Sequence, residues 1–272
     1  MTFDMLRLLF IHHSCGGQWL APRGADLGSA CIYESAVNGG GLRDRLKASG
    51  YEVHEASYGS RVGDRTDIFD WPVKFRERMD DVLRCDRQDA LYADRQENHI
   101  VVFKSCFPNN LFVGPGAPPG DPEGPELTLA NAMAAYRALL PEFRQHPATL
   151  FVAVTAPPLA RTRRSLRTWI RRRLLGGTDP RASAEHARDF NNWLKDAEEG
   201  WLCGYPGSNV VVFDLFDVLT DYGKSNFSCY ASGPGHDDNH PSAEGNALAT
   251  DAFVPFLNRA VRSAGLVQGQ SI

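Results

Sequence analysis

The sequence predicts an α/β protein in which helices cover both faces of a five-stranded parallel sheet. Five short apolar runs recur along its 272 residues, and helix-like segments separate them. Three of these runs are apolar almost without interruption, which is typical of strands that are buried on both faces. A repeated strand–helix order of this kind favours right-handed crossovers and a three-layer α/β/α sandwich.

The predicted strands are rich in Val, Ile, Leu and Phe, which favour extended backbone. In chain order they are MLRLLFIH (5–12), YEVHEAS (51–57), HIVVFKS (99–105), TLFVAVTA (149–156) and NVVVFDLF (209–216). Helices are expected between and after them, at 39–49, 73–84, 127–145, 183–197 and 242–263, with Pro255 interrupting the last. In such sheets, functional residues gather at the carboxyl ends of the strands.

No internal repeat and no long linker divides the chain, so a single domain over residues 1–272 is expected. The Gly/Pro-rich segment 114–126 is interpreted as a surface loop between the third strand and its helix. The content of apolar residues, 43%, is ample for a packed core of this size.

The charge and cysteine patterns exclude several classes of partner and cofactor. A formal net charge of -4 gives no overall attraction to nucleic acid. The six cysteines form no CxxC pair and no paired-ligand spacing with histidine, so a zinc site is not predicted, and mostly reduced thiols are expected. No other cofactor is predicted. No apolar run approaches the roughly 20 residues of a spanning helix. The N-terminus does not resemble a signal peptide, so a cytoplasmic location is expected, with a secreted form whose leader has been removed as the alternative.

Two segments carry the residue types of nucleophilic catalysis. Ser14 directly follows the first strand in HHSCGG, and a serine hydroxyl needs a base to remove its proton. His240, in GHDDNHPSAEGN, precedes the last helix, and Asp237 stands three residues before it. A carboxylate there can fix the imidazole tautomer and stabilise its charged form. The alternative is a polar turn with a surface histidine.

With these motifs in order, the chain resembles the SGNH, or GDSL-like, hydrolase superfamily, whose sheet is flavodoxin-like. The resemblance implies that Ser14 is the nucleophile, and that Asp237 and His240 of DDNHP are the acid and base. It also implies an oxyanion hole built from Ser14 N–H, a glycine after the second strand and an asparagine after the third. GDS is replaced by HHSC here, so the chain represents a divergent branch.

The oxyanion glycine implied by this resemblance is Gly63 in VGDRT, with Gly59 as the alternative. After the third strand the chain has KSCFPNN, where Asn109 is the expected side-chain donor and Asn110 the next candidate. The glycine and aspartate that usually accompany this asparagine are missing. Cys15 is the alternative nucleophile, because a thiolate at a helix N-terminus near histidine would be activated.

Residues expected at the rim of the site include an arginine-rich segment. Residues 161–181 hold eight arginines against one acidic residue, and an apolar stripe at helical spacing predicts a helical insertion. Arg164 and Arg167 are candidate substrate contacts there, either for an anionic substrate or for anionic lipid. Trp71 is a candidate aromatic platform, with a buried core position as the alternative.

The sequence therefore predicts a serine esterase that hydrolyses an O-acyl ester of a carbohydrate or another small polar molecule through an acyl-enzyme. Two alternatives stay open. One is a lipid-directed esterase or acyltransferase, which the arginine-rich segment alone suggests; binding to a membrane surface is not favoured. The other is a binding module without catalysis. The expected partner is the small-molecule ester, and the oligomeric state is not predicted.

Overall fold

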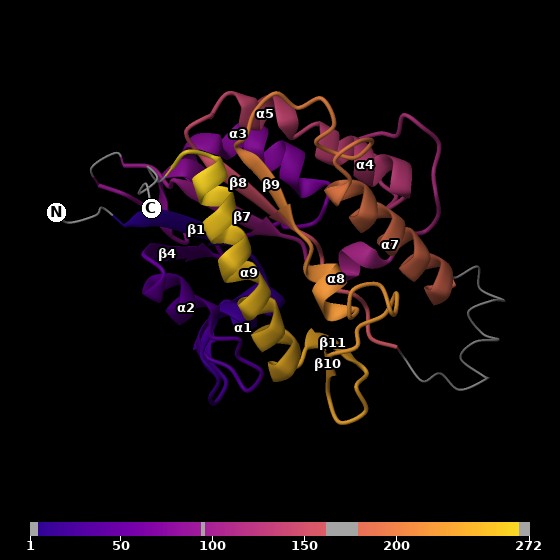
Figure 1. The fold of residues 1–272 in the computed structure, drawn as a ribbon, viewed down its shortest axis with the longest axis horizontal. Coiled ribbons are helices and arrows are strands. Elements are labelled where there is room, and N and C mark those ends of the chain that lie inside the picture. Colours follow the sequence, from indigo (N-terminus) through magenta and orange to yellow (C-terminus); the bar gives the residue numbers. More distant parts are fainter. Residues whose placement is uncertain (1–4, 94–95, 162–178, 267–272) are drawn as a thin grey trace.

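A computed structural model describes residues 5–93, 96–161 and 179–266 (Figure 1). Its central sheet has the strand order β6-β5-β4-β1-β7-β8-β9. The five predicted strands are present as β1 (Leu6–Ile11), β4 (Tyr51–Ala56), β7 (Ile100–Lys104), β8 (Leu150–Val154) and β9 (Val210–Phe213). All four of their neighbouring pairs are parallel. The α/β class and the parallel core are therefore confirmed.

The sheet has seven strands rather than the five predicted. The two additional strands are β5 (Cys85–Arg87) and β6 (Ala90–Leu91), which extend the edge beyond β4. β5 lies parallel to β4, and β6 turns back antiparallel. These strands are three and two residues long, so they contain too few residues for an apolar or alternating pattern to be detected.

Alternate side chains of the strands pack on opposite faces of the sheet, as the pleat requires. Leu9 and Ile11 of β1 join one cluster of buried residues, whereas Leu8 and Phe10 join the other. Helices α3 (Asp70–Arg84), α4 (Leu129–Arg137), α5 (Leu140–Arg144) and α7 (Pro180–Lys195) cover the first face, and α1 (Ser14–Leu20), α2 (Leu42–Ala48) and α9 (Ala243–Ser263) cover the second (Figure 1). The result is the predicted three-layer arrangement.

The helices begin and end close to the predicted positions. They are α2 (Leu42–Ala48), α3 (Asp70–Arg84), α4 (Leu129–Arg137), α5 (Leu140–Arg144), α7 (Pro180–Lys195) and α9 (Ala243–Ser263). The single helix predicted at 127–145 is divided into α4 and α5, with Pro141 in the first turn of α5. Pro255 lies inside α9 without ending it.

Several short elements were not predicted from the sequence. They are α1 (Ser14–Leu20), α8 (Leu215–Leu219), the 3-10 helix η1 (Phe107–Asn110), and the hairpins of β2 (Leu27–Ser29) with β3 (Ile32–Ser35) and of β10 (Ala231–Ser232) with β11 (Asp238–Pro241). In the described part of the chain, no helix is both long enough and apolar enough to cross a bilayer.

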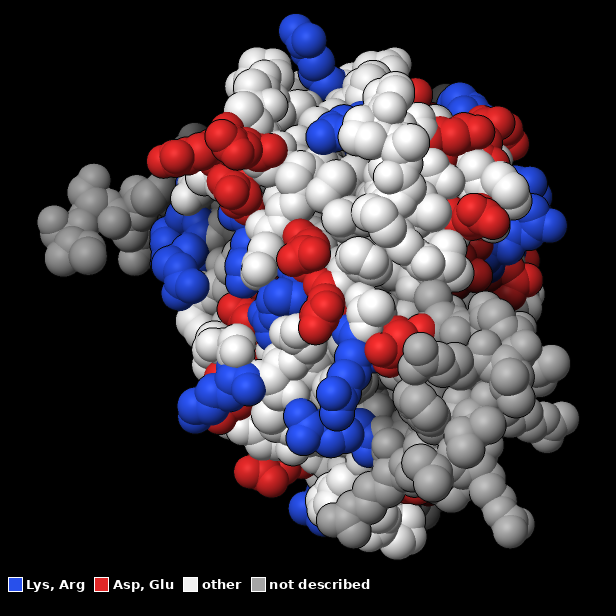
Figure 2. Space-filling view, turned by 90° about the vertical axis from the view of Figure 1, so that its right-hand side faces the viewer, with Lys and Arg blue, Asp and Glu red and all other residues white. Residues whose placement is uncertain are grey.

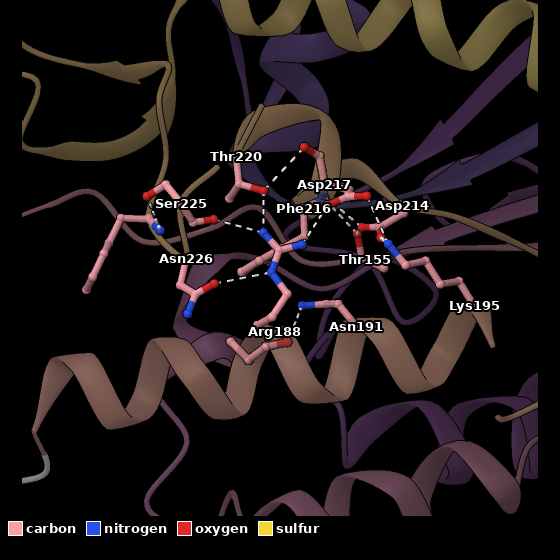
Figure 3. Close-up of polar contacts among 12 residues, drawn as sticks. Thr155, Arg188, Asn191, Lys195, Asp214, Phe216, Asp217, Thr220, Ser225 and Asn226 are labelled. Atoms are coloured by element: carbon pink, nitrogen blue, oxygen red, sulfur yellow. Dashed lines mark hydrogen bonds and ion pairs between the residues drawn. The ribbon is translucent and has the colours of Figure 1, made fainter. Parts of the chain in front are cut away.

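A network of polar contacts around Arg188 fastens α7 to α8 and to the segment that leads to β10 (Figure 3). The guanidinium donates to Asp217 Oδ1 at 2.6 Å and to Thr220 Oγ1 at 2.6 Å. It also reaches the Ser225 carbonyl at 2.8 Å and Asn226 Oδ1 at 3.3 Å. One side chain thus ties the helix layer to the chain just before the β10–β11 hairpin.

Charged side chains of both signs are interspersed over the described face shown in Figure 2, and neither sign covers it. The expected arginine-rich helix at 161–181 lies almost wholly outside the described residues, and Arg164 and Arg167 with it. All six cysteines lie in the described part of the chain, and none forms a disulfide there.

Candidate active site

Ser14 and His240, 226 positions apart in the chain, meet at the carboxyl ends of the parallel strands. Ser14 is the first residue of α1, which follows β1 after two histidines, and His240 lies on β11. Their Oγ and Nε2 atoms are 3.0 Å apart. This is the hydrogen-bond distance at which an imidazole can accept a serine proton.

A carboxylate holds the other ring nitrogen of His240, and it belongs to Asp238. Asp238 Oδ1 lies 2.8 Å from His240 Nδ1 and also accepts the His240 backbone N–H at 3.1 Å. Partial burial opposes ionisation of Asp238, but hydrogen bonding to His240 and the interaction with its charge together outweigh this and lower the Asp238 pKa. An ionised Asp238 fixes a proton on Nδ1 and leaves Nε2 free to accept from Ser14.

Asp237, the carboxylate expected from the D-x-x-H spacing, does not make this contact. Residues 238–241 form a strand, and residues two apart on a strand project from the same face. Asp238 therefore shares a face with His240, while Asp237 precedes the strand and places its carboxylate beside Gly233 and Gly235. In this geometry the carboxylate beside His240 is therefore that of Asp238, whereas the sequence pattern had favoured its neighbour Asp237.

Gly63 contacts His13, the residue before Ser14, but its N–H is already bonded. The N–H donates to Ser60 Oγ at 2.6 Å, and the Gly63 carbonyl instead accepts from His13 Nε2 at 3.1 Å. A Cβ at this position would lie 2.0 Å from the Ser57 carbonyl oxygen, so only glycine fits. The alternative, Gly59, adopts φ +84 and lies in open space, and its N–H donates to Asp64 Oδ1.

Asn109 and Asn110 are buried cross-links rather than free donors. The amide of Asn109 donates to Asp67 Oδ1 at 2.8 Å and to the Cys106 carbonyl at 3.3 Å, while its oxygen accepts from the Ile68 N–H. Asn110 donates to the backbone carbonyls of residues 156 and 157. Both NH₂ groups are therefore engaged, and neither is available to a developing oxyanion in this geometry.

The two histidines before Ser14 have different environments. His12 is fully buried and lies 3.1 Å from Glu55, which also pairs with Arg43. His13 is half-buried, and burial lowers its pKa, which favours the neutral ring. It donates from Nε2 to Gly63 and accepts at Nδ1 from Thr66 Oγ1 at 3.0 Å. His13 therefore links the chain before Ser14 to the segment that holds Gly63.

Cys15 is poorly suited to be the nucleophile. Its side chain is almost fully buried, at 2% exposed. A hydrogen bond to the Cys106 side chain, together with burial, raises the pKa of the Cys15 thiol well above its usual range. Since the thiolate is the reactive form of cysteine, a neutral buried thiol is inert. Ser14, whose Oγ lies 3.0 Å from His240 Nε2, is the better candidate.

Trp71 is a core residue and not a substrate platform. Its side chain is fully buried, packs edge to face on Phe103 and donates from its indole N–H to Ser105 Oγ at 2.8 Å. Two other aromatic rings border the site instead. Tyr58 stacks on His13 with ring centroids 3.6 Å apart, and Phe107 contacts the His240 ring edge to face at 5.3 Å.

Sequence reasoning missed Asp238, Tyr58 and Phe107 as site residues. Asp238 could have been found only by recognising DNHP as a strand, in which alternate side chains lie on the same face. DNHP is too short and too polar to be recognised as a strand. Tyr58 directly follows the predicted strand 51–57, and Phe107 lies two residues after the predicted strand 99–105. Functional residues gather at the carboxyl ends of strands, and both residues lie there. This rule applies equally to every residue at those ends, so it does not identify Tyr58 and Phe107 in particular.

Comparisons with known proteins identify one family. The model of the family described as GDSL-like Lipase/Acylhydrolase matches residues 107–253, just over half of the chain. Among solved structures, a catalytic mutant of Axe2, an acetylxylan esterase from Geobacillus stearothermophilus, matches 99% of this chain and 100% of its own at 14% identity, with a TM-score of 0.42. A carbohydrate esterase family 2 enzyme from Myceliophthora fergusii with a carbohydrate binding domain matches 96% of this chain and 67% of its own at 13% identity, with a TM-score of 0.42. A search of curated proteins finds no match.

Proposed function

Because this chain belongs to the GDSL-like lipase/acylhydrolase family and is an ester-hydrolysing enzyme, we propose that Ser14 is its nucleophile and His240 its general base. The observation that carries the proposal is the 3.0 Å contact between Ser14 Oγ and His240 Nε2. Asp238 completes a Ser-His-Asp triad from its position 2.8 Å from His240 Nδ1. This arrangement can activate a serine without a cofactor.

The reaction runs through an acyl-enzyme. His240 Nε2 takes the Ser14 proton as Oγ attacks the ester carbonyl, and the same proton then passes to the leaving alcohol. Water next gives a proton to His240 and attacks the acyl carbon, and the Ser14 oxygen regains a proton as the carboxylic acid leaves. The ionised Asp238 stabilises the imidazolium that forms in each half-reaction.

We assign oxyanion stabilisation to the backbone N–H of Ser14, the first residue of α1. The N–H groups of Gly16 and Gly17 already donate to the His13 carbonyl, whereas the first N–H of a helix has no intrahelical acceptor and can donate to a developing negative charge. The donors of Gly63 and Asn109 are bonded elsewhere. We assign these two residues instead to holding the loop beside Ser14 in place.

We propose an O-acyl ester of a carbohydrate or another small polar molecule as the substrate class. The ring of Tyr58 stacks on His13, and the ring of Phe107 contacts His240. Flat aromatic faces of this kind can support a sugar ring. Tyr58 is 41% exposed, so its ring is accessible to a substrate. A lipid-directed activity would depend on the arginine-rich segment 161–181.

A comparison of two substrate types tests this function. Wild-type protein and Ser14→Ala are assayed for acetate release from acetylated sugars and for hydrolysis of long-chain esters. Acetate release that depends on Ser14 is the expected result. Preferential hydrolysis of long-chain esters favours the lipid-directed alternative, and full activity of Ser14→Ala contradicts the assigned nucleophile.

A further inference from the structure

A buried lysine lies directly behind the segment that borders Ser14. Lys74, on α3, is only 6% exposed. Its Nζ donates to the carbonyl oxygens of Val62 and Asp64, at 2.5 and 2.6 Å. It also lies 5.0 Å from the centre of the Trp71 ring, within the range of a cation–π interaction. Among the described residues, the hydrogen-bond acceptors of this ammonium are two backbone carbonyls, and burial favours the neutral form of a lysine.

We call residues 57–67 the glycine loop. The two carbonyls that accept from Lys74 belong to Val62 and Asp64, the residues on either side of Gly63 in this loop. The Val62 carbonyl belongs to the same peptide as the Gly63 N–H, so Lys74 sets the orientation of that peptide. The N–H is held on its opposite side by Ser60 Oγ, and the next carbonyl, that of Gly63, is held by His13. His13 immediately precedes Ser14. A continuous chain of contacts thus runs from the Lys74 ammonium to the nucleophile.

Near neutral pH, Lys74 is present in both its charged and its neutral form. Burial lowers its pKa to about 7. Three groups of each sign face it from the glycine loop and α3, and they line a cleft of about 410 Å³; they are Arg61, Arg65, Arg78, Asp64, Asp70 and Glu77. Asp70 and Asp64 favour the charged form and Arg78 disfavours it, but burial has the largest effect and decides the direction of the shift. A charged ammonium forms stronger hydrogen bonds than a neutral amine.

We propose that Lys74 is a positioning residue for catalysis, whose ammonium holds the glycine loop against His13 and thereby keeps Ser14 in line with His240. This inference rests on the proposed function, because it assigns a role within the same reaction. Lys74 touches neither substrate nor the reacting atoms. Its proton controls how firmly the glycine loop is held.

The test is the dependence of kcat and KM on pH in the wild type and in Lys74→Met, with Lys47→Met as a matched control. Lys47 is an exposed lysine on α2, away from the glycine loop. In the wild type, kcat should fall on the alkaline side with a midpoint near pH 7, as Lys74 loses its proton. Lys74→Met should lack this fall and show a kcat about 10- to 100-fold lower at pH 6, with a smaller change in KM, because small misplacements of catalytic groups cost rate. Lys47→Met should follow the wild-type profile.

The outcomes separate this inference from the proposed function. Hydrolysis that survives Ser14→Ala contradicts the proposed function. Ser14-dependent hydrolysis with the same kcat and pH profile in Lys74→Met as in the wild type overturns the role of Lys74 alone. Should Lys74→Met fail to fold, Lys74→Arg decides, since a guanidinium stays charged throughout the range. Its alkaline fall should move above pH 9, and a fall that stays near pH 7 overturns the inference.

Discussion

At the scale of single residues, the site depends on which of two adjacent aspartates shares a face with His240. The D-x-x-H spacing draws attention to Asp237, yet the local strand β11 presents Asp238 and His240 together. A pattern in the sequence specifies spacing, whereas the backbone conformation decides which side chains converge. Spacing therefore draws attention to this loop, but it does not determine which of the two carboxylates lies beside His240.

The two aspartates provide a matched pair of variants. Asp238→Asn should lower kcat by about 100- to 10,000-fold, because an amide can favour the wrong tautomer of His240 and cannot stabilise its charge. Asp237→Asn should leave kcat within about threefold of the wild type. Steady-state kinetics on a single ester substrate checks both, and a larger loss in Asp237→Asn would reverse the assignment.

Lys74 also predicts a dependence of stability on pH. Its pKa is about 7 in the folded protein and about 10.4 in an unfolded chain. Between these values the unfolded state binds more protons, so this lysine makes the free energy of unfolding rise with pH. The wild type should gain about 1.4 kcal/mol per pH unit relative to Lys74→Met between about pH 8 and 10. Urea unfolding at several pH values measures this difference, and a constant difference contradicts the lowered pKa.

At the scale of elements, long apolar runs were predicted well and short polar elements were not. The five buried strands are each visible as a run of apolar residues, because both of their faces are covered. α1 begins with SCGG, and glycine disfavours helix, so local propensity conceals it. β5, β6 and β11 have between two and four residues, and tertiary contacts determine their conformation.

The same limit explains the oxyanion residues. Gly63 and Asn109 occur at the positions that the resemblance implies, after the second and third predicted strands. Their hydrogen-bond partners are Ser60, Asp67 and backbone groups of neighbouring loops. The hydrogen-bond partner of a buried amide depends on which groups lie beside it in the folded chain. No pattern in the sequence predicts those neighbours.

The network around Arg188 is expected to stabilise the contact between α7 and α8. The side chains of Arg188 and Asp217 are 13% and 22% exposed, and each hydrogen bond to a charged group in such a partly buried site contributes about 1.5–3 kcal/mol. Arg188→Ala should therefore lower the free energy of unfolding by about 3 kcal/mol, measured by urea denaturation. The exposed pair of Arg45 with Asp251 supplies a control, and Arg45→Ala should cost less than about 1 kcal/mol. Equal effects of the two variants would count against the network.

At the scale of the whole molecule, one sheet supports both layers and the site. The strands β1, β7 and β8 contribute side chains to both buried clusters. Ser14 follows β1, and Phe107 and Asn109 follow β7, so the sheet positions these residues from its carboxyl edge. We therefore propose that residues 1–272 form a single domain, with the 161–181 segment as an insertion.

A single domain of this kind should unfold in one cooperative transition. The two clusters cannot separate without disrupting the strands that they share, so loss of near-UV circular dichroism and loss of activity should coincide in urea. Two separate transitions would instead indicate that the chain divides into independently stable parts.

The most direct test of the central claim is covalent labelling by a serine-reactive fluorophosphonate, with the modified residue located by peptide mass spectrometry. We predict that the wild type and Cys15→Ser are labelled at Ser14, that Ser14→Ala is not labelled, and that His240→Ala reacts at least 100-fold more slowly. Labelling of another residue, or a folded wild-type protein that is not labelled at all, would contradict the assignment of Ser14 and His240.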